Sequence, residues 1–170
     1  PWVGRVDASK HWPDTLKLTV FEQLPYARWG GDRLVSASGK LFSVPDMSTV
    51  QGLPQLDGPD DRVADVLAFH VRCVRQFSSS RLLVRAVRLS DRGGWHVLLD
   101  NDVVIEVGSE NTDARLQRLT EVWSQIAAGR EAPAAIDLRY ENGFSVRWNE
   151  PAESTSTPAG ATPTTPINKA

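Results

Sequence analysis

The sequence predicts an α+β protein in which two helices pack against a largely antiparallel β-sheet. Short apolar stretches with period-two alternation recur along the chain and are separated by turns rich in Gly, Pro and Asp. Two windows, 60–77 and 111–128, instead repeat their apolar residues every three or four positions. The 170 residues, 41% hydrophobic and 24% charged, suit one globular domain with room for part of another.

Bulk composition excludes several classes of protein. The net charge of −2 argues against general nucleic-acid binding, which needs a strongly basic face. The lone Cys73 rules out an internal disulfide. No segment approaches the roughly 20 apolar residues of a membrane span, and the N-terminus lacks a signal-peptide pattern. Because the chain opens on Pro1 without Met, we expect a fragment or processed product.

The N-terminal third predicts strands joined by short turns. Residues 3–8 and 15–22 form a hairpin closed by the segment SKHWPD. A meander follows, with Gly30-Gly31 and Ser38-Gly39 supplying its turns and with strands at 25–29, 33–36 and 40–43. Residues 44–61 predict a loop with a short extended piece at 53–56.

The first helix is predicted from Asp60 to Phe77. Asp60 or Asp61 is expected to cap its start. The stripe expected to face the core consists of Val63, Val66, Leu67, His70, Val71, Val74 and Phe77.

The rest of the chain predicts strands at 81–90, 94–100 and 102–108, with a tight turn at Asp100-Asn101. A second helix follows from Asn111 or Thr112 to Ala128, stopped by Gly129. Its buried face consists of Leu116, Leu119, Val122, Trp123 and Ile126. Strands at 134–140 and 143–148 are then predicted to meet at a type I′ turn on Asn142-Gly143.

No pattern indicates an enzyme, a metal or a cofactor. His11, His70 and His96 are scattered, with no second ligand at helical spacing. His70 is expected on the rim of its helix, and Cys73, on the buried stripe, is expected to be an inert thiol. Asp100 and Asp102 start like a calcium loop, but Val104 takes a ligand position and the glycine is missing. No P-loop, nucleophile elbow or dinucleotide motif occurs.

Two features favour protein binding. The first is a basic run, which is either a solvated surface neutralised by Asp57, Asp60, Asp61 and Asp65 or a docking face for an acidic partner. It consists of Arg72, Arg75, Arg81, Arg85, Arg88 and Arg92. The second is the C-terminal hairpin, because a last strand is often an edge that another chain can extend. Tyr140 and Trp148 on this hairpin pack on the core or contact that partner.

The sequence resembles the FtsQ/DivIB family of bacterial cell-division proteins over residues 1 to about 150. The first part of the resemblance is Pro1-Trp2-Val3, Trp12-Pro13-Asp14-Thr15-Leu16, Glu22-Gln23, Pro25, Ala27-Arg28-Trp29, Gly39 and LFSVP. The segments GWHVLLDNDVVIEVG, ARLQRLTEVW and IDLRYENGFSVRW follow in family order.

This resemblance implies a domain organisation. Residues 1–23 correspond to the C-terminal strands of a truncated POTRA domain, and 24–150 to the FtsQ-type β domain. Residues 151–170, poor in large apolar groups, are expected to be a disordered tail. The parent protein would be a single-pass protein of the bacterial inner membrane whose span is missing here, so that these residues lie in the periplasm.

The resemblance also implies a function: a non-enzymatic divisome scaffold that binds FtsB and FtsL and links early divisome assembly to septal peptidoglycan synthesis. FtsB would add a strand to the last strand, contacting Arg139, Tyr140, Asn142, Gly143, Phe144, Ser145, Val146 and Trp148, with Arg88 or Arg92 as a further contact. Two alternatives are a POTRA-type chaperone or transport module, which needs repeated POTRA units, and a wall hydrolase, which needs a carboxylate pair or metal site.

Overall fold

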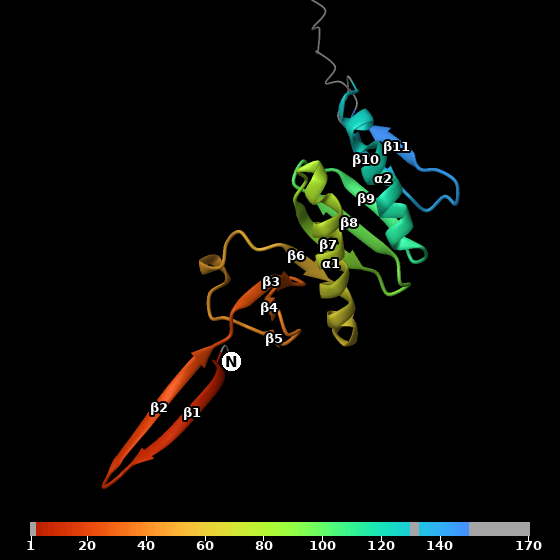
Figure 1. Cartoon of the computed structure of the whole chain (residues 1–170). Helices are drawn as coiled ribbons and strands as arrows, with labels where there is room; N and C mark the ends of the chain where they lie inside the picture. The colour runs from red at the N-terminus through yellow and green to blue at the C-terminus, as the bar shows by residue number, and fades with distance from the viewer. Residues whose placement is uncertain (1–2, 130–132, 150–170) are drawn as a thin grey trace, which may run out of the picture.

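The computed structural model describes residues 3–129 and 133–149 and contains one two-stranded sheet, one nine-stranded sheet and two helices (Figure 1). The predicted α+β class is confirmed. The strands are β1 (Val3–His11), β2 (Thr15–Glu22), β3 (Pro25–Trp29), β4 (Arg33–Ser36), β5 (Leu41–Phe42), β6 (Gln55–Asp57), β7 (Val84–Leu89), β8 (Trp95–Leu99), β9 (Val104–Gly108), β10 (Pro133–Asp137) and β11 (Ser145–Trp148). The helices are α1 (Val63–Phe77) and α2 (Thr112–Ala127), with short 3-10 turns at Met47–Thr49, Asp60–Arg62 and Ser78–Ser80.

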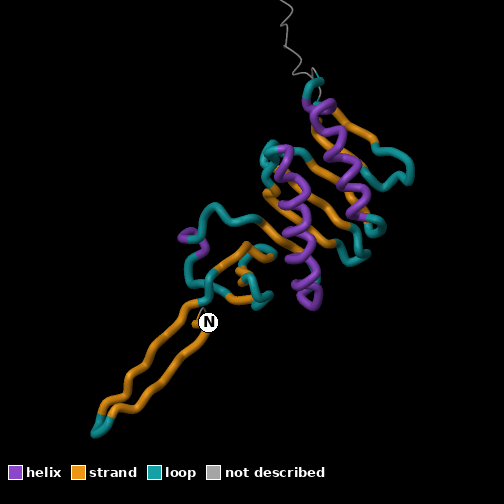
Figure 2. The backbone as a smooth tube through the Cα atoms, in the orientation of Figure 1, coloured by secondary structure: helices purple, strands orange, loops and turns teal. Residues whose placement is uncertain are grey.

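The nine-stranded sheet has the order β11-β10-β9-β8-β7-β6-β3-β4-β5. Most neighbours run antiparallel, while β3 with β6, β6 with β7, and β9 with β10 run parallel. Each parallel join needs a crossover connection. Helix α1 follows β6 and leads to β7, and α2 follows β9 and leads to β10, so both helices are crossovers and lie on the same face of the sheet (Figure 2).

The core lies between this sheet and the two helices. One cross-strand row of buried residues faces the helices, and it consists of Leu56, Val87, Val97, Ile105 and Ile136. From α1, Phe69 stacks on Trp95 of β8 with ring centroids 4.1 Å apart. Burial of such side chains is the main stabilising term for the domain.

The hairpin of β1 and β2 projects away from the nine-stranded sheet (Figure 1). Every residue of the two strands except Val3 is exposed. The cross-strand register puts Leu18 opposite Ala8 and Val20 opposite Val6 on one face, and Leu16 lies on the same face. The predicted hairpin is therefore present, and one of its faces is apolar and uncovered within the described residues.

Helix α1 differs from its prediction at its start and along its exposed side. Asp60 and Asp61 lie in a 3-10 turn and neither caps the helix, whose N-cap position is Arg62, without a side-chain capping bond. The Asp60 carboxylate instead accepts hydrogen bonds from the Trp29 indole at 3.0 Å and from Arg33. A carboxylate already paired with two donors on the sheet is not available for capping.

The buried stripe of α1 is also shifted around the helix. Phe69 and Cys73 are fully buried, whereas Val71 and Val74, predicted to face the core, are 44% and 46% exposed. His70, predicted on the rim, is buried. The sheet covers only part of the wide apolar face that the sequence encodes.

The predicted type I′ turn at Asn142-Gly143 is absent. Asp137 pairs with Ser145 at the end of the β10–β11 ladder, so seven residues, 138–144, connect the two strands. Neither Asn142 nor Gly143 has the positive φ that a type I′ turn requires. The predicted tail at 151–170 lies outside the described residues.

Candidate partner-binding edge

The last strand, β11, lies at one edge of the nine-stranded sheet and pairs only with β10 among the described residues. In an antiparallel pair, alternate residues direct their backbone N–H and C=O groups toward the neighbour and away from it. The outer set on β11 is therefore available to another strand. The edge position predicted from the sequence is present.

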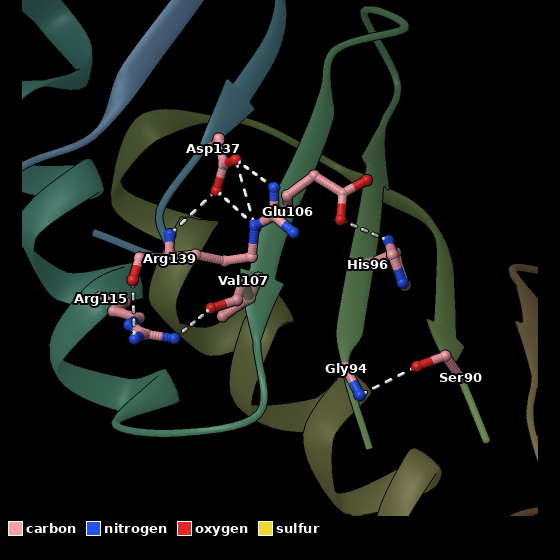
Figure 3. Close-up of polar contacts among 8 residues, drawn as sticks. All are labelled: Ser90, Gly94, His96, Glu106, Val107, Arg115, Asp137 and Arg139. Atoms are coloured by element: carbon pink, nitrogen blue, oxygen red, sulfur yellow. Dashed lines mark hydrogen bonds and ion pairs between the residues drawn. The ribbon is translucent and has the colours of Figure 1, made fainter. Parts of the chain in front are cut away.

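The loop before β11 is held by arginines of α2. Arg115 is buried and donates to the backbone carbonyls of Val107, at 2.8 Å, and Arg139, at 3.1 Å (Figure 3). Arg118 donates to the carbonyls of Glu141, at 2.9 Å, and Gly143, at 3.3 Å. Arg115 and Arg118 thus satisfy three backbone carbonyls of the 138–144 connection that lies outside the β10–β11 ladder. These bonds explain why the seven-residue connection is stable without a tight turn.

Gly108, at the end of β9, makes this arrangement possible. Its φ of +82° is unfavourable for residues with a side chain, and a Cβ at this position would lie 2.6 Å from Nη1 of Arg115 and 3.1 Å from Cγ of Arg139. A glycine is therefore required both by the backbone conformation and by the close approach of the two arginines.

The face of the sheet opposite the helices carries a polar row that crosses six strands. Direct register partners place these side chains on the same face: Asp57, Arg88, His96, Glu106, Asp137 and Ser145. His96 Nδ1 lies 2.7 Å from a Glu106 carboxylate oxygen, and Arg88 lies 3.4 Å from Asp57. The row ends at Ser145 on the edge strand, so a strand added there would adjoin a charged surface; Figure 3 shows its members His96, Glu106 and Asp137.

Arg139 and Asp137 form the pair nearest to the edge. The Arg139 guanidinium donates through Nε and Nη2 to the Asp137 carboxylate, with the shortest distance 2.6 Å. These bonds are the main cause that lowers the pKa of Asp137, and burial opposes them. Arg139 itself remains largely exposed and is oriented by this contact (Figure 3).

The structure gathers most of the predicted site residues at one end of the sheet, in two different environments. Tyr140 is 58% exposed and Trp148 is 39% exposed. Phe144 and Val146 are half-buried and pack against the core, so a partner strand would reach their backbone rather than their side chains. Ser145 is exposed on the polar face, and Asn142 and Gly143 lie in the loop that Arg118 holds.

Arg88 and Arg92 lie farther away. Arg88 is on β7, four strand spacings from β11, or about 19 Å at the usual separation of strands. Arg92 lies in the turn between β7 and β8, which is closed by the Ser90 N–H bond to Gly94. Both belong to the same sheet as the edge but not to its immediate surroundings.

The basic run is split by the fold. Within the described residues, Arg72 pairs with Asp113, Arg85 with Asp102 and Arg88 with Asp57. Of the four aspartates expected to neutralise the run, only Asp57 forms an ion pair with it in the described segments, since Asp60 pairs with Arg33, Asp65 with Arg62, and Asp61 with no basic group there.

Sequence reasoning missed several residues of the site, namely Gly108, Arg115, Arg118, Asp137, His96 and Glu106. Arg115 occupies a helix position where its neighbours Leu116 and Leu119 face the core, and nothing local marks an arginine there as buried. His96 and Glu106 become partners only through the register of β8 and β9. The available sequence signal for His96 and Glu106 was a polar residue within an otherwise apolar strand pattern.

Other candidate chemistry is not supported within residues 3–129 and 133–149. The predicted burial of Cys73 is confirmed, and this burial raises the pKa of its thiol to about 12. No group of three or more His, Cys, Asp or Glu side chains lies together there as a set of metal ligands. No helix in these segments is long and apolar enough to cross a membrane.

Residues 27–139 match the family model described as "Cell division protein FtsQ/DivIB, C-terminal". The chain is 40% identical to "Cell division protein FtsQ" of Xanthomonas campestris pv. campestris over 146 residues, which are 86% of this chain and 52% of the relative. It is 33% identical to the protein of the same name from Escherichia coli strain K12, over 91% of this chain and 59% of the relative. A third relative with this name, from Aliivibrio fischeri, is 33% identical over 87% of this chain and 58% of its own length.

The extent of these matches bears on the site. The chain spans only about half to three fifths of the length of the relatives named above. The family match ends at Arg139, before the edge strand at 145–148.

Proposed function

Because the chain belongs to the FtsQ/DivIB family of cell-division proteins, we propose that it is a non-enzymatic divisome scaffold that binds FtsB by β-strand addition. The observation that carries the proposal is the position of β11 at the sheet edge, with one side unpaired within the described residues. Strand addition supplies affinity through main-chain hydrogen bonds and specificity through side chains at alternate positions.

The partner strand would lie along residues 144–148. Trp148 ends this segment and Tyr140 lies in the loop before it; both side chains are exposed, and exposed aromatics at a docking edge are favoured anchors. Arg139, fixed by Asp137, would present a guanidinium to an acidic group of FtsB, while Asn142 and Gly143 shape the loop beside it. Ser145 would contact the partner from the polar face of the sheet.

FtsL would join through FtsB, and the assembly would link early divisome assembly to septal peptidoglycan synthesis. In this proposal the whole protein is anchored in the inner membrane by a single N-terminal span, and residues 1–170 lie in the periplasm. The chain spans only part of its relatives, so these statements concern the longer protein.

We further propose that residues 1–23 are the last strands of a POTRA domain and that 24–150 form the β domain. The uncovered apolar face of the hairpin supports this division, because a ribbon with Val6, Leu16, Leu18 and Val20 on one face needs a covering layer. The covering layer would be supplied by the part of the longer protein that precedes this chain.

A proline scan of β11 tests the proposed edge. Proline removes one N–H, so substitutions at 144, 145, 146 and 147 should alternate in their effects. One pair of positions should abolish FtsB binding with little loss of stability, and the other pair should destabilise the β10–β11 ladder. Binding is measured by calorimetry and stability by urea unfolding. Binding retained by every folded variant would contradict strand addition at β11.

The two exposed aromatics provide a second arm of this experiment. Tyr140→Ala and Trp148→Ala should each cost about 1 to 4 kcal/mol of FtsB binding if both side chains are anchors. Trp12→Ala, on the distant hairpin turn, is a matched control because Trp12 is 88% exposed. Equal binding by all three variants would remove the aromatic contacts from the proposal.

Arg88 and Arg92 are proposed as a long-range electrostatic contribution. Arg88→Glu and Arg92→Glu should weaken FtsB binding more at low salt than at high salt, because exposed charges are screened over about 10 Å at 0.1 M ionic strength. The FtsB affinities of both variants, measured at a low and a high salt concentration, test this contribution. If both charge reversals leave the affinity unchanged, the two arginines are part of an ordinary solvated surface.

A further inference from the structure

The exposed side of α1 carries an apolar ridge that nothing in the described chain covers. Val71 and Val74 are three residues apart on this side of the helix, with the buried Leu67 four residues before Val71 and Ser78, just past the helix end, four residues after Val74. Val71 and Val74 are 44% and 46% exposed. Eleven residues of helix span about 16 Å, the length of about three turns of a second helix.

A hollow lies on each side of this ridge. The larger, of about 880 Å³, lies between the C-terminal half of α1 and the segments before β6 and β7, and its apolar lining includes Leu53, Pro54, Val74, Leu82 and Leu83. The smaller, of about 520 Å³, lies between α1 and the β4–β5 turn, and its lining includes Ala37, Gly39, Ala64, Leu67 and Val71. A ridge flanked by two apolar hollows can interdigitate with large side chains of a docked helix.

His70 and Tyr26 form a polar floor beneath the ridge. His70 borders the larger hollow and Tyr26 borders the smaller one, and the Tyr26 hydroxyl lies 2.8 Å from His70 Nδ1. The His70 side chain is buried, with a relative exposure of 5%, and burial lowers its pKa while a hydrogen bond with the Val84 backbone opposes that shift. The His70–Tyr26 pair therefore belongs to the packed base beneath the ridge.

The rims of both hollows are basic. Arg72 and Arg75 border the smaller hollow, and Arg81 and Arg85 border the larger one. Arg75 and Arg81 form no ion pair within 4.0 Å in the described part of the chain. The one acidic residue at these rims, Asp100, already accepts a hydrogen bond from the Leu83 N–H. Because Arg72 pairs with Asp113 and Arg85 with Asp102, the positive charge that is unpaired along the borders, within the described residues, comes from Arg75 and Arg81.

We propose that this surface, the ridge of α1 with its two hollows, binds an acidic amphipathic helix of a protein partner. The apolar side of that helix would lie on Val71 and Val74, and its carboxylates would pair with Arg75 and Arg81. The surface is formed by α1 with segments next to β3, β4, β6 and β7. Three strands, β8 to β10, separate these elements from β11 in the sheet, so the inference does not depend on the proposed binding of FtsB.

The test uses a synthetic helical peptide with leucine at every third or fourth position and glutamate elsewhere. A peptide with lysine in place of glutamate is its control. Binding to the chain is measured by fluorescence anisotropy, and methyl NMR shifts of valine and leucine locate the contact. We expect the acidic peptide to shift the methyl signals of Val71, Val74 and Leu83 and to bind at least about tenfold more tightly than the lysine peptide.

Variants separate this surface from the rest of the molecule. Arg75→Glu with Arg81→Glu, and separately Val71→Ser with Val74→Ser, should each weaken acidic-peptide binding by about tenfold or more. Arg88→Glu with Arg92→Glu changes the net charge equally and should change binding by less than about twofold. Arg81 has a positive φ, whereas the other substituted residues have ordinary backbone conformations. Circular dichroism verifies that each variant is folded.

Three results would overturn the proposal: no binding of the acidic peptide, equal binding by the Arg75/Arg81 variant, or methyl shifts confined to residues near β11. A second copy of the chain is the competing occupant. Concentration-dependent dimerisation by sedimentation, abolished by Val71→Ser with Val74→Ser, would assign the surface to self-association and reject a separate partner.

Discussion

Two short antiparallel ribbons lie at the ends of the described chain: the N-terminal hairpin and the C-terminal pair of β10 and β11. They differ in which chemical groups they expose. The hairpin is exposed on both faces and shows a continuous apolar face. In the C-terminal pair, Ile136 is buried, Val146 packs against the core, and α2 arginines hold the connecting loop. The hairpin exposes apolar side chains, whereas β11 exposes backbone.

This difference indicates what kind of neighbour each ribbon can bind. A two-stranded ribbon with one apolar face is marginally stable alone and gains free energy from a layer that covers its side chains. An edge strand whose side chains already pack inward gains from a strand that satisfies its backbone groups. The hairpin is therefore suited to a place within a folded domain, and β11 to a separate chain.

The largest expected effect concerns the support of the C-terminal pair. Gly108→Ala should destabilise the domain by about 2 to 4 kcal/mol, because it combines a strained positive φ with displacement of the buried Arg115. Urea unfolding measures the loss. FtsB affinity should also fall, because the loop at 138–144 loses its anchor on Arg115.

Gly143→Ala is the matched control for this variant. Gly143 has no positive φ, and a Cβ there meets nothing within 4 Å, so the change in stability should be below about 0.5 kcal/mol. If both substitutions cost the same, the close approach at Gly108 does not support the loop.

The hairpin should respond to substitution only when its apolar face is covered. Leu18→Ala in this chain should change the unfolding free energy by less than about 0.5 kcal/mol, because Leu18 is 58% exposed. In the longer protein the same substitution should cost about 2 to 4 kcal/mol, as for a buried leucine. Equal small effects in both proteins would show that no layer covers this face.

A smaller effect than those of Gly108→Ala and of Leu18→Ala in the longer protein is expected from the pH dependence of the Asp137–Arg139 pair. The pKa of Asp137 is lowered below its ordinary value of 3.8. Its contribution to stability is therefore fully present above the unfolded pKa and is lost as the pH falls through the lower, folded pKa. The stability difference between the natural chain and Asp137→Asn should be constant above about pH 5, at most about 1 kcal/mol, and should disappear in acid. A difference independent of pH would exclude this ion pair as its source.

Much of this architecture follows from apolar periodicity. The hairpin, the β3–β4–β5 meander and both helices begin and end within a few residues of where their patterns predict, because each pattern is bounded by turn residues with a defined backbone role. Gly30 and Gly39, for example, both adopt the positive φ expected at their turns. The edge position of the last strand also agreed with the structure.

The differences arise where distant parts of the chain compete with a local preference. Asn142-Gly143 is a strong local turn signal, but Arg115 and Arg118, more than twenty residues earlier, bind the carbonyls of a longer loop. Asp60 has a side chain suited to capping the helix that follows it, but its carboxylate instead accepts hydrogen bonds from Trp29 and Arg33. Val71 and Val74 fit the helical stripe, but only the sheet's position decides which part of a wide stripe is covered.

Amide hydrogen exchange of β11 with and without FtsB tests the central claim most directly. In the free chain, alternate amides among residues 145–148 should exchange rapidly, because they point away from β10 and have no partner among the described residues. On addition of FtsB these same amides should slow by at least about tenfold, while the amides of β1 and β2 remain unchanged. Unchanged exchange throughout β11 in the complex, or protection confined to the hairpin, would contradict strand addition at this edge.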